Sequence, residues 1–382
     1  MKKRLIPLVA LALLGGAVTS CGGETSKPVV ETKNIYAISY NLADPNMSSL
    51  WKEGLETASV ELGFNKISLA DAKNKDEEAV NMVETAGKEN YDAYLINVVN
   101  QTNGKQYLNK VKDTNKPVVF WNREVETAVL KSYEKAYYVG IESAEGGRYQ
   151  GAMAAEYINK AGFDTIDRNH DGKLGVIVVR GEKSHADAEA RTQFSPAYLE
   201  RGLTGGNPTA ELKKKDSGYE VDTAKGAWNK VEVKAIVDGT DLGGNGWDPV
   251  TAANEVARTL SKEGDKIDLV LSNNDGMALG IVADSNFKAS GCPIWGVDAL
   301  ADALTEINKA DSQLKGTVQN DGKAQAKVCV QVAKNLKEGK GFADGIKTVA
   351  TKEAWEKDGL AVWSDTATKS LRVHHAKIVK TA

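Results

Sequence analysis

Cysteine is scarce in this sequence, and several familiar motifs are missing. Only three cysteines stand among 382 residues, and the spacing of Cys292 and Cys329 matches no metal-binding or redox motif. We expect these two to be inert buried thiols or a bridged pair. No phosphate-binding loop is present either, because neither Lys-Ser nor Lys-Thr follows the stretch GGNG and no G-x-G-x-x-G opens a helix. No repeat of fixed period is visible.

The sequence also has no excess of positive charge, with 49 Lys and Arg residues against 52 Asp and Glu. The formal net charge is −3, and removal of the first twenty residues would delete three positive charges and no negative ones. Nothing in this balance attracts a nucleic acid, which excludes nucleic-acid partners. Apolar residues make up 41% and charged residues 26% of a chain long enough for two domains, a profile typical of a globular protein.

The N-terminus has the pattern of an export signal, which we assign to residues 1–20. Three basic residues precede an apolar run from Leu5 to Val18 that is too short to span a bilayer. Small residues then lead to Cys21, which resembles the lipobox of bacterial lipoproteins and implies cleavage before a lipid-bearing cysteine. The alternative is an ordinary secretory signal in which Cys21 is incidental. Residues 21–33 are expected to form a flexible tether.

From residue 34 onward, short β-branched or aromatic runs alternate with amphipathic stretches. Strands are expected in 35–41, 91–99 and 116–122, and helices over Met47 to Leu62 and Asp76 to Lys88. Further strands are expected in 172–180, 231–239, 267–275 and 293–300. The alternation predicts parallel sheets covered by helices on both faces, and the number of strands favours two α/β lobes. Residues 204–230 break the rhythm and are expected to form a surface excursion of the second lobe.

Polar residues recur where the predicted strands end. Ligands of open α/β sheets bind outside the carboxyl ends of the strands, and the residues at those positions are Asp44, Asn97, Asn274, Asp275, Asp298 and Asn320. Each has a structural alternative, since Asn274 and Asp298 could cap the helices that follow and Asn97 could belong to a turn.

The stretch HADAEAR concentrates charge at one predicted helix start. Asp187 and Arg191 share a helix face, with His185 near the first turn. These residues either belong to a capped helix start with a solvated ion pair, or they bind a ligand. Trp247 precedes a predicted helix with Asp248 as its N-cap. It is either a hydrophobic staple of that helix or an apolar platform at a ligand site. Planar polar groups beside an aromatic face suit a monosaccharide, whose hydroxyls donate and accept while its C–H faces are apolar.

A second constellation lies in DRNHDGKLG, residues 167–175. Oxygen side chains at alternate positions followed by Gly172 match the first half of a calcium loop. The second half is missing, because its last position is Val178 within a predicted strand. The alternative is a polar turn.

These features together resemble the bacterial glucose/galactose-binding proteins, the extracytoplasmic receptors of sugar ABC transporters. The likeness runs from Ile35 to about Gly345 and is carried by KAYYVG, HADAEAR, NNDGMALG, GVDAL and GTVQNDGKAQAK. It implies an α/β fold of two Rossmann-like lobes with parallel sheets, joined by a three-strand hinge with crossings near Gly140, Asn320 and His374. The expected segments are 34–140 and 320–373 for the first lobe, and 141–319 and 374–382 for the second.

The resemblance also implies a ligand set and a metal set. The sugar contacts fall on Asp44, Asn97, His185, Asp187, Arg191, Trp247, Asn274, Asp298 and Asn320. Calcium would be held by Asp167, Asn169, Asp171, the Lys173 carbonyl and Asp268. Two departures weaken these expectations. Asn46 stands where the family has an aromatic ring, with Met47 or Trp295 as candidates to compensate, and Gly175 removes one calcium ligand.

The implied function is a monomeric, lipid-anchored receptor outside the cytoplasm, without catalytic residues. It would bind glucose or galactose by hinge closure and deliver the sugar to an ABC transporter permease, with a chemoreceptor as a further partner. Ribose or xylose is the alternative ligand. A glycosidase using Asp44, Asp187 or Asp298 is the alternative function, although Arg191 should neutralise Asp187 and unfit it as a general acid. A transcription regulator would need an N-terminal helix-turn-helix in place of the export signal.

Overall fold

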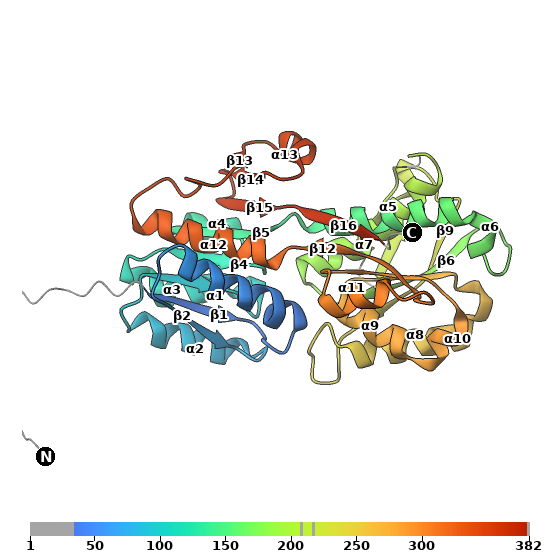
Figure 1. Ribbon diagram of the computed structural model, residues 1–382, viewed down its shortest axis with the longest axis horizontal. Helices are drawn as coiled ribbons and strands as arrows, with labels where there is room; N and C mark the ends of the chain where they lie inside the picture. The colour runs from blue at the N-terminus through green and yellow to red at the C-terminus, as the bar shows by residue number, and fades with distance from the viewer. Residues whose placement is uncertain (1–33, 207–208, 216–217, 380–382) are drawn as a thin grey trace, which may run out of the picture. The chain divides into compact units, whose positions relative to one another are not determined.

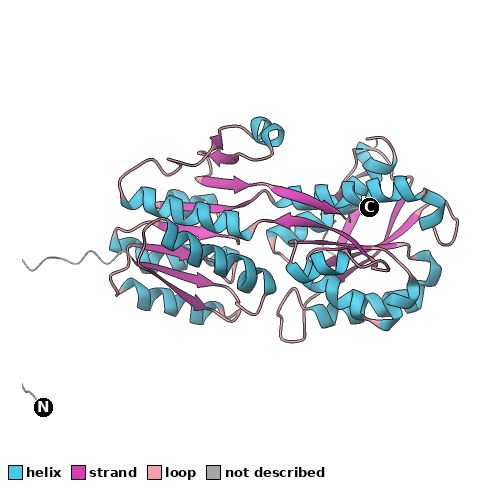
Figure 2. Ribbon diagram, in the orientation of Figure 1, coloured by secondary structure: helices cyan, strands magenta, loops and turns pink. Residues whose placement is uncertain are grey.

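Two mainly parallel β-sheets organise the chain, each covered by helices (Figure 1, Figure 2). The computed structural model describes residues 34–206, 209–215 and 218–379, so the expected signal, the tether and Cys21 lie outside the described residues. The first sheet has eight strands. In spatial order they are β13 (Thr348–Val349), β14 (Val362–Asp365), β15 (Ser370–Val373), β5 (Ala136–Ile141), β4 (Val118–Trp121), β3 (Ala93–Ile96), β1 (Asn34–Ser39) and β2 (Lys66–Asp71).

The second sheet has six strands. Their order is β16 (His375–Val379), β12 (Leu314–Asn320), β11 (Ile294–Val297), β10 (Leu269–Ser272), β6 (Leu174–Arg180) and β9 (Val231–Asp238). In both sheets the strand pairs are parallel apart from β14–β15 and β12–β16. Parallel pairing requires crossover connections, which the helices between the strands provide.

The helices divide between the two lobes. Those of the first lobe are η1 (Met47–Trp51), α1 (Lys52–Glu61), α2 (Asp76–Gly87), η2 (Gln101–Asn103), α3 (Gly104–Val111), η3 (Lys112–Thr114), α4 (Thr127–Lys131), α12 (Gly322–Lys337) and α13 (Lys352–Asp358). Those of the second are α5 (Ser143–Ala161), α6 (Phe163–Ile166), α7 (Ala186–Leu203), η4 (Thr223–Lys225), α8 (Pro249–Glu263), η5 (Gly264–Lys266), α9 (Asp275–Ala283), α10 (Ser285–Ser290) and α11 (Ala301–Ile307).

The chain passes from one sheet to the other at three places. It leaves the first sheet after Ile141, at the end of β5, and α5 packs against α7 and β12 of the second lobe. It returns after Asn320, at the end of β12, and α12 packs on α1 and the first sheet. It crosses again between Val373 and His375, from β15 to β16.

Each sheet is buried on both faces, as the apolar runs require. Along β1, Ile35 and Ala37 join one core cluster, whereas Tyr36 and Ile38 join the cluster on the opposite face. The strand β6, with its run of valines and isoleucine, feeds two further clusters in the same alternating way. Successive side chains of a strand point to opposite faces, so a run of apolar residues fills both cores.

The sequence predictions for the fold are confirmed, with refinements. The expected helix from Met47 begins with the π-helical turn η1 before α1. The excursion at 204–230 contains a two-stranded antiparallel sheet, β7 (Leu212–Lys215) with β8 (Gly218–Val221). Cys292 and Cys329 are free, buried thiols, so the bridged alternative is wrong. No helix within the described ranges is both long and apolar enough to cross a membrane.

Candidate ligand-binding site

One narrow cavity brings most of the predicted site residues together. Its lining includes Asp44, His185, Asp187, Arg191, Trp247, Asn274, Asp298 and Asn320 of the predicted set, with Tyr40, Asn46, Met47 and Asn122 in addition. The first lobe, the second lobe and the hinge strand β12 all contribute. Its empty volume is about 350 Å³. A small pocket lined mainly by polar side chains from two lobes suits a small polar ligand.

His185 is both a helix cap and a wall of the cavity. Its Nδ1 accepts the backbone N–H of Asp187 at 3.2 Å, at the first turn of α7. Burial, followed by the Arg123 charge, lowers the pKa of His185 to about 4. The ring is therefore neutral at pH 7 and carries its proton on Nε2, because Nδ1 acts as acceptor. His185 Nε2–H is thus a neutral hydrogen-bond donor at the cavity, in addition to the helix cap that Nδ1 provides.

Asp187 and Arg191 do not pair with each other, so the ion pair expected between them is wrong. The Ser143 hydroxyl donates to Asp187 Oδ1 at 2.6 Å, and Arg191 Nη1 donates to the Asn273 carbonyl at 2.8 Å. Burial alone would raise the pKa of Asp187, but His185, the Arg191 charge and the Ser143 hydroxyl together hold it below its usual value. Arg191 Nε is buried without a partner among the described residues. Each group thus keeps hydrogen-bonding capacity for the cavity.

Trp247 lies between the core of the second lobe and the cavity. The indole packs against the apolar core of the second lobe and also lines the cavity. The His185 ring meets it edge-on with centroids 5.3 Å apart, and the Arg191 guanidinium lies 6.0 Å from its centroid. Gly181 permits this position, since a Cβ there would lie 2.1 Å from two ring carbons. The backbone N–H of Trp247 donates to the Gly181 carbonyl at 3.0 Å, which fixes the indole against that glycine.

Asn274 and Asp298 were both possible helix caps, and only Asn274 acts as one. Asn274 is the N-cap of α9, where its Oδ1 accepts the Met277 N–H at 2.9 Å, so its amide nitrogen is the donor left for the cavity. Asp298 caps nothing, because α11 begins only at Ala301 with Leu300 in the cap position. Its φ of +120° is unfavourable for a side-chain-bearing residue and is typical of functional sites.

Asp298 also has an unusual protonation behaviour. Burial, opposed by the Arg191 charge and assisted by Asp44, raises its pKa to about 7. Asn320 Nδ2 donates to its Oδ1 at 3.2 Å. The backbone around it is held by Asp275, whose carboxylate accepts from the Thr317 hydroxyl at 2.7 Å and from the Leu300 N–H at 2.9 Å. Asp275 is therefore a positioning residue for the Asp298 loop.

A chain of contacts links Asp44 to the facing lobe. The Tyr40 hydroxyl donates to Asp44 Oδ2, and the Arg123 guanidinium lies over the Tyr40 ring at 3.8 Å. Arg123 then reaches across to Glu182 of the second lobe, with Nη2 to Oε2 at 2.7 Å and Nη1 to Oε1 at 3.3 Å. Sequence reasoning missed Tyr40, Asn122, Arg123 and Ser143, although the position of Arg123 just after β4 was a usable signal.

Asn97 does not line the cavity but contacts two residues that do. Its Nδ2 lies 3.5 Å from the Met47 sulfur and 3.4 Å from Asn122 Oδ1. Of the two residues considered as replacements for the missing aromatic ring, Met47 lines the cavity. Trp295 is fully buried in the core of the second lobe, so that hypothesis is wrong for Trp295.

The loop at 167–175 does not fit calcium well. Both Asp268 oxygens accept backbone N–H groups, from Arg168 at 2.7 Å and Gly175 at 2.6 Å. Asp171 bonds the Asn169 amide and the Lys173 N–H, each at 2.9 Å, and Asp167 Oδ2 accepts the Gly172 N–H at 2.8 Å. Among the described side-chain oxygens of the expected calcium ligands, Asp167 Oδ1 is the one that is buried without a partner. Across the described residues no group of three or more His, Cys, Asp or Glu is arranged to hold a metal.

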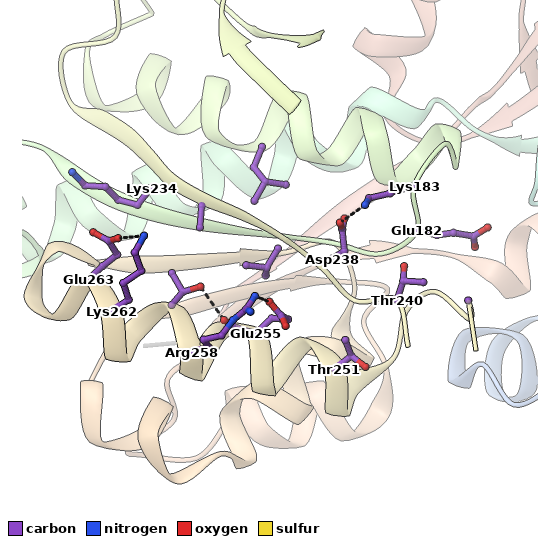
Figure 3. Close-up of a pocket in the computed structure, with 15 residues that line it drawn as sticks. Glu182, Lys183, Lys234, Asp238, Thr240, Thr251, Glu255, Arg258, Lys262 and Glu263 are labelled. Carbon is purple, nitrogen blue, oxygen red and sulfur yellow. Dashed lines mark hydrogen bonds and ion pairs between the residues drawn. The ribbon is translucent and has the colours of Figure 1, made fainter. Parts of the chain in front are cut away.

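A larger hollow lies on the second lobe, between the edge strand β9 and α8 (Figure 3). Its charged side chains largely satisfy each other: Lys183 pairs with Asp238 at 3.0 Å and Lys262 with Glu263 at 3.0 Å. None of the predicted ligand residues lines it. The narrow cavity between the lobes is therefore the candidate site.

Known proteins resemble this chain over most of its length. The sequence matches a periplasmic binding protein domain over residues 35–341. It is 33% identical over 306 residues to the D-galactose/methyl-galactoside binding periplasmic protein of Haemophilus influenzae, covering 80% of this chain and 82% of that protein.

Solved structures share the fold. An ABC transporter periplasmic solute binding protein from Actinobacillus succinogenes with bound D-allose superposes with a TM-score of 0.66, at 15% identity, over 91% of this chain and 98% of that one. The Caulobacter myo-inositol binding protein bound to myo-inositol gives 0.61 at 16% identity, over 93% and 95% of the two chains.

Proposed function

The chain belongs to the periplasmic binding protein family, and from this premise we propose that it is an extracytoplasmic receptor that binds one monosaccharide between its lobes. The receptor would deliver the sugar to the permease of an ABC transporter. Residues 1–20 would direct export, and a lipid on Cys21 would anchor the chain at the membrane surface. A chemoreceptor is a further proposed partner.

The observation that carries the proposal is the composition of the cavity wall. Asp44, Asp187 and Asp298 supply acceptors, while Arg191 and His185 supply donors, and Trp247 adds an apolar face. A sugar hydroxyl donates one hydrogen bond and accepts others, whereas the C–H face of the ring is apolar. An uncharged polyol is the ligand class that matches this alternation.

Binding is proposed to close the lobes. The polar groups come from both lobes and can satisfy one ligand together only when the lobes are near each other, so a ligand favours the closed arrangement. Protein contacts between the lobes add to closure. Beside the Arg123–Glu182 pair, Asn74 Nδ2 donates to Asn245 Oδ1 at 3.0 Å, and the Ala186 N–H donates to Gln101 Oε1 at 3.2 Å.

Galactose and glucose are the proposed ligands, supported by the galactose-binding relative. Ribose and xylose are the alternatives. A glycosidase finds some support in the contrast between Asp187, with a lowered pKa, and Asp298, with a raised one. The lowered pKa of Asp187 keeps that group ionised and unfit as a general acid, and the relative described above is a binding protein, so we favour the receptor.

Calorimetric titration of the purified chain with glucose, galactose, ribose and xylose tests the proposal. Saturable binding of one sugar per chain is the expected result, and it should vanish in Asp187→Ala, which removes an acceptor and leaves Arg191 without a compensating charge. Incubation with galactosides serves as the second assay. Release of free sugar at a rate that depends on Asp298 would overturn the receptor in favour of the enzyme.

A further inference from the structure

Asn46 is a buried amide that the protein itself does not satisfy. The residue is only 4% exposed and lines the candidate cavity. Neither its Oδ1 nor its Nδ2 has a hydrogen-bond partner among the described residues. Its backbone N–H donates to Asp44 Oδ1 at 2.8 Å, which holds the residue next to a carboxylate of the site.

No neighbouring side chain takes up this amide. Met47, the next residue, is apolar and occupies the same wall. Asn97 behind that wall directs its Nδ2 to the Met47 sulfur and to Asn122. Buried polar groups in proteins are almost always paired, and an orphan donor and acceptor on one side chain usually mark a place where a ligand completes the network.

The two lobes therefore offer different surfaces to a ring held between them. Trp247 of the second lobe presents an indole, which suits the C–H face of a ring. Asn46 belongs to the first lobe and presents one donor and one acceptor. A pyranose with all substituents equatorial has two apolar faces and directs its hydroxyls to the rim. A ring with an axial hydroxyl directs that group out of the ring plane, toward one wall.

We infer that Asn46 selects a six-membered polyol ring that carries an axial hydroxyl on the face turned away from Trp247. This inference rests on the proposed function and specifies its ligand class. The axial hydroxyl would accept from Nδ2 and donate to Oδ1, so it satisfies both orphan atoms at once. Glucose in its all-equatorial chair leaves the Asn46 amide unpaired in the closed site, and a site built to bond a hydroxyl discriminates against a ligand that lacks it.

Calorimetry with glucose, galactose, allose and myo-inositol tests the inference, because the β-pyranose of glucose has no axial hydroxyl whereas the β-pyranoses of galactose and allose, and myo-inositol, each carry one. In the unmodified chain at least one of them should bind about tenfold or more tightly than glucose. Asn46→Leu, which keeps the size of the side chain and removes both polar atoms, should reduce that preference by about tenfold. Ser49→Ala, at an exposed position of the same helical turn that does not line the cavity, is the matched control and should keep the preference.

Thermal melting separates a ligand role from a structural one. Asn46→Leu should raise the melting temperature of the ligand-free protein, because it replaces an unsatisfied buried amide by an apolar group. Asn46→Ala supplies a second variant, should the leucine perturb the fold. A preference for glucose in the unmodified chain, or a preference that survives both Asn46 variants, would overturn the inference alone. Failure of every sugar and cyclitol to bind would overturn the proposed function together with it.

Discussion

Replacing Gly181 by alanine should displace the indole of Trp247. A Cβ at this position would lie 2.1 Å from ring atoms Cε3 and Cζ3, whereas carbon atoms in contact are about 3.5–4.0 Å apart. The ring must therefore move by more than about 1 Å. Overpacking of this kind costs about 1–3 kcal/mol of stability. If the ring covers one face of the sugar, loss of that contact should weaken binding by about 1–3 kcal/mol, or about 5- to 150-fold.

Calorimetry and tryptophan fluorescence measure the two consequences. The Gly181→Ala variant should bind its sugar more weakly and show a smaller fluorescence change on binding than the unmodified chain. Gly276→Ala is the matched control. A Cβ at Gly276, within α9, would lie an ordinary 3.6 Å from the nearest atom, which belongs to the Asn274 amide. This variant should therefore keep the affinity of the unmodified chain. Unaltered affinity and fluorescence in Gly181→Ala would refute the platform role of Trp247 and leave it a core residue.

Three further results are expected. Arg123→Ala should weaken sugar binding by about tenfold, since a buried charge-paired bridge between the lobes is lost, and Glu182→Ala should weaken it by a similar factor; calorimetry that finds neither effect would contradict the bridge as a closure contact. His185 has a depressed pKa of about 4 against an ordinary 6.5, so its contribution to stability is complete above pH 6.5 and is lost as the pH falls toward 4, by up to about 3 kcal/mol. Thermal melts from pH 4 to 8 should show this decline, and His185→Asn, which keeps a capping oxygen, should flatten it. Calcium added to chelator-treated protein should leave the melting temperature unchanged, because Asp268 already bonds two backbone amides; a clear rise would show that the loop binds the ion.

The fold and most of the cavity could be predicted because they follow from local patterns. Runs of β-branched residues produce strands buried on both faces, and the parallel connection rule brings their carboxyl ends to one edge. Asn274 and Asp298 follow β10 and β11 within two residues, and Asp44 lies in the loop after β1, so position in the sequence was enough to place them. Asp248 and Pro249 at the start of α8 were equally readable, since the Asp248 carboxylate caps Thr251 at 2.7 Å.

The contacts that tune the site could not be predicted, because they join residues far apart in the chain. Ser143 reaches Asp187 from another helix, and Arg123 meets Glu182 from another lobe. A helical spacing of four made an Asp187–Arg191 pair the natural expectation. Spacing alone cannot reveal that each side chain has a different partner. The calcium hypothesis stays a prediction, and the loop pattern likewise does not say that Asp268 bonds the backbone N–H groups of Arg168 and Gly175.

The buried carboxyl group of Asp298 should couple sugar binding to proton release. Burial raises the pKa of Asp298 to about 7, so near neutral pH a substantial fraction of this group carries a proton in the free site. Hydrogen bonds from sugar hydroxyls favour the ionised form and lower the pKa. Binding near pH 7 should then release protons, and the calorimetric heat should differ between buffers of different ionisation enthalpy. The difference should disappear in Asp298→Asn, which cannot titrate. Equal heats in both buffers for the unmodified chain would contradict a hydrogen bond from the sugar to Asp298.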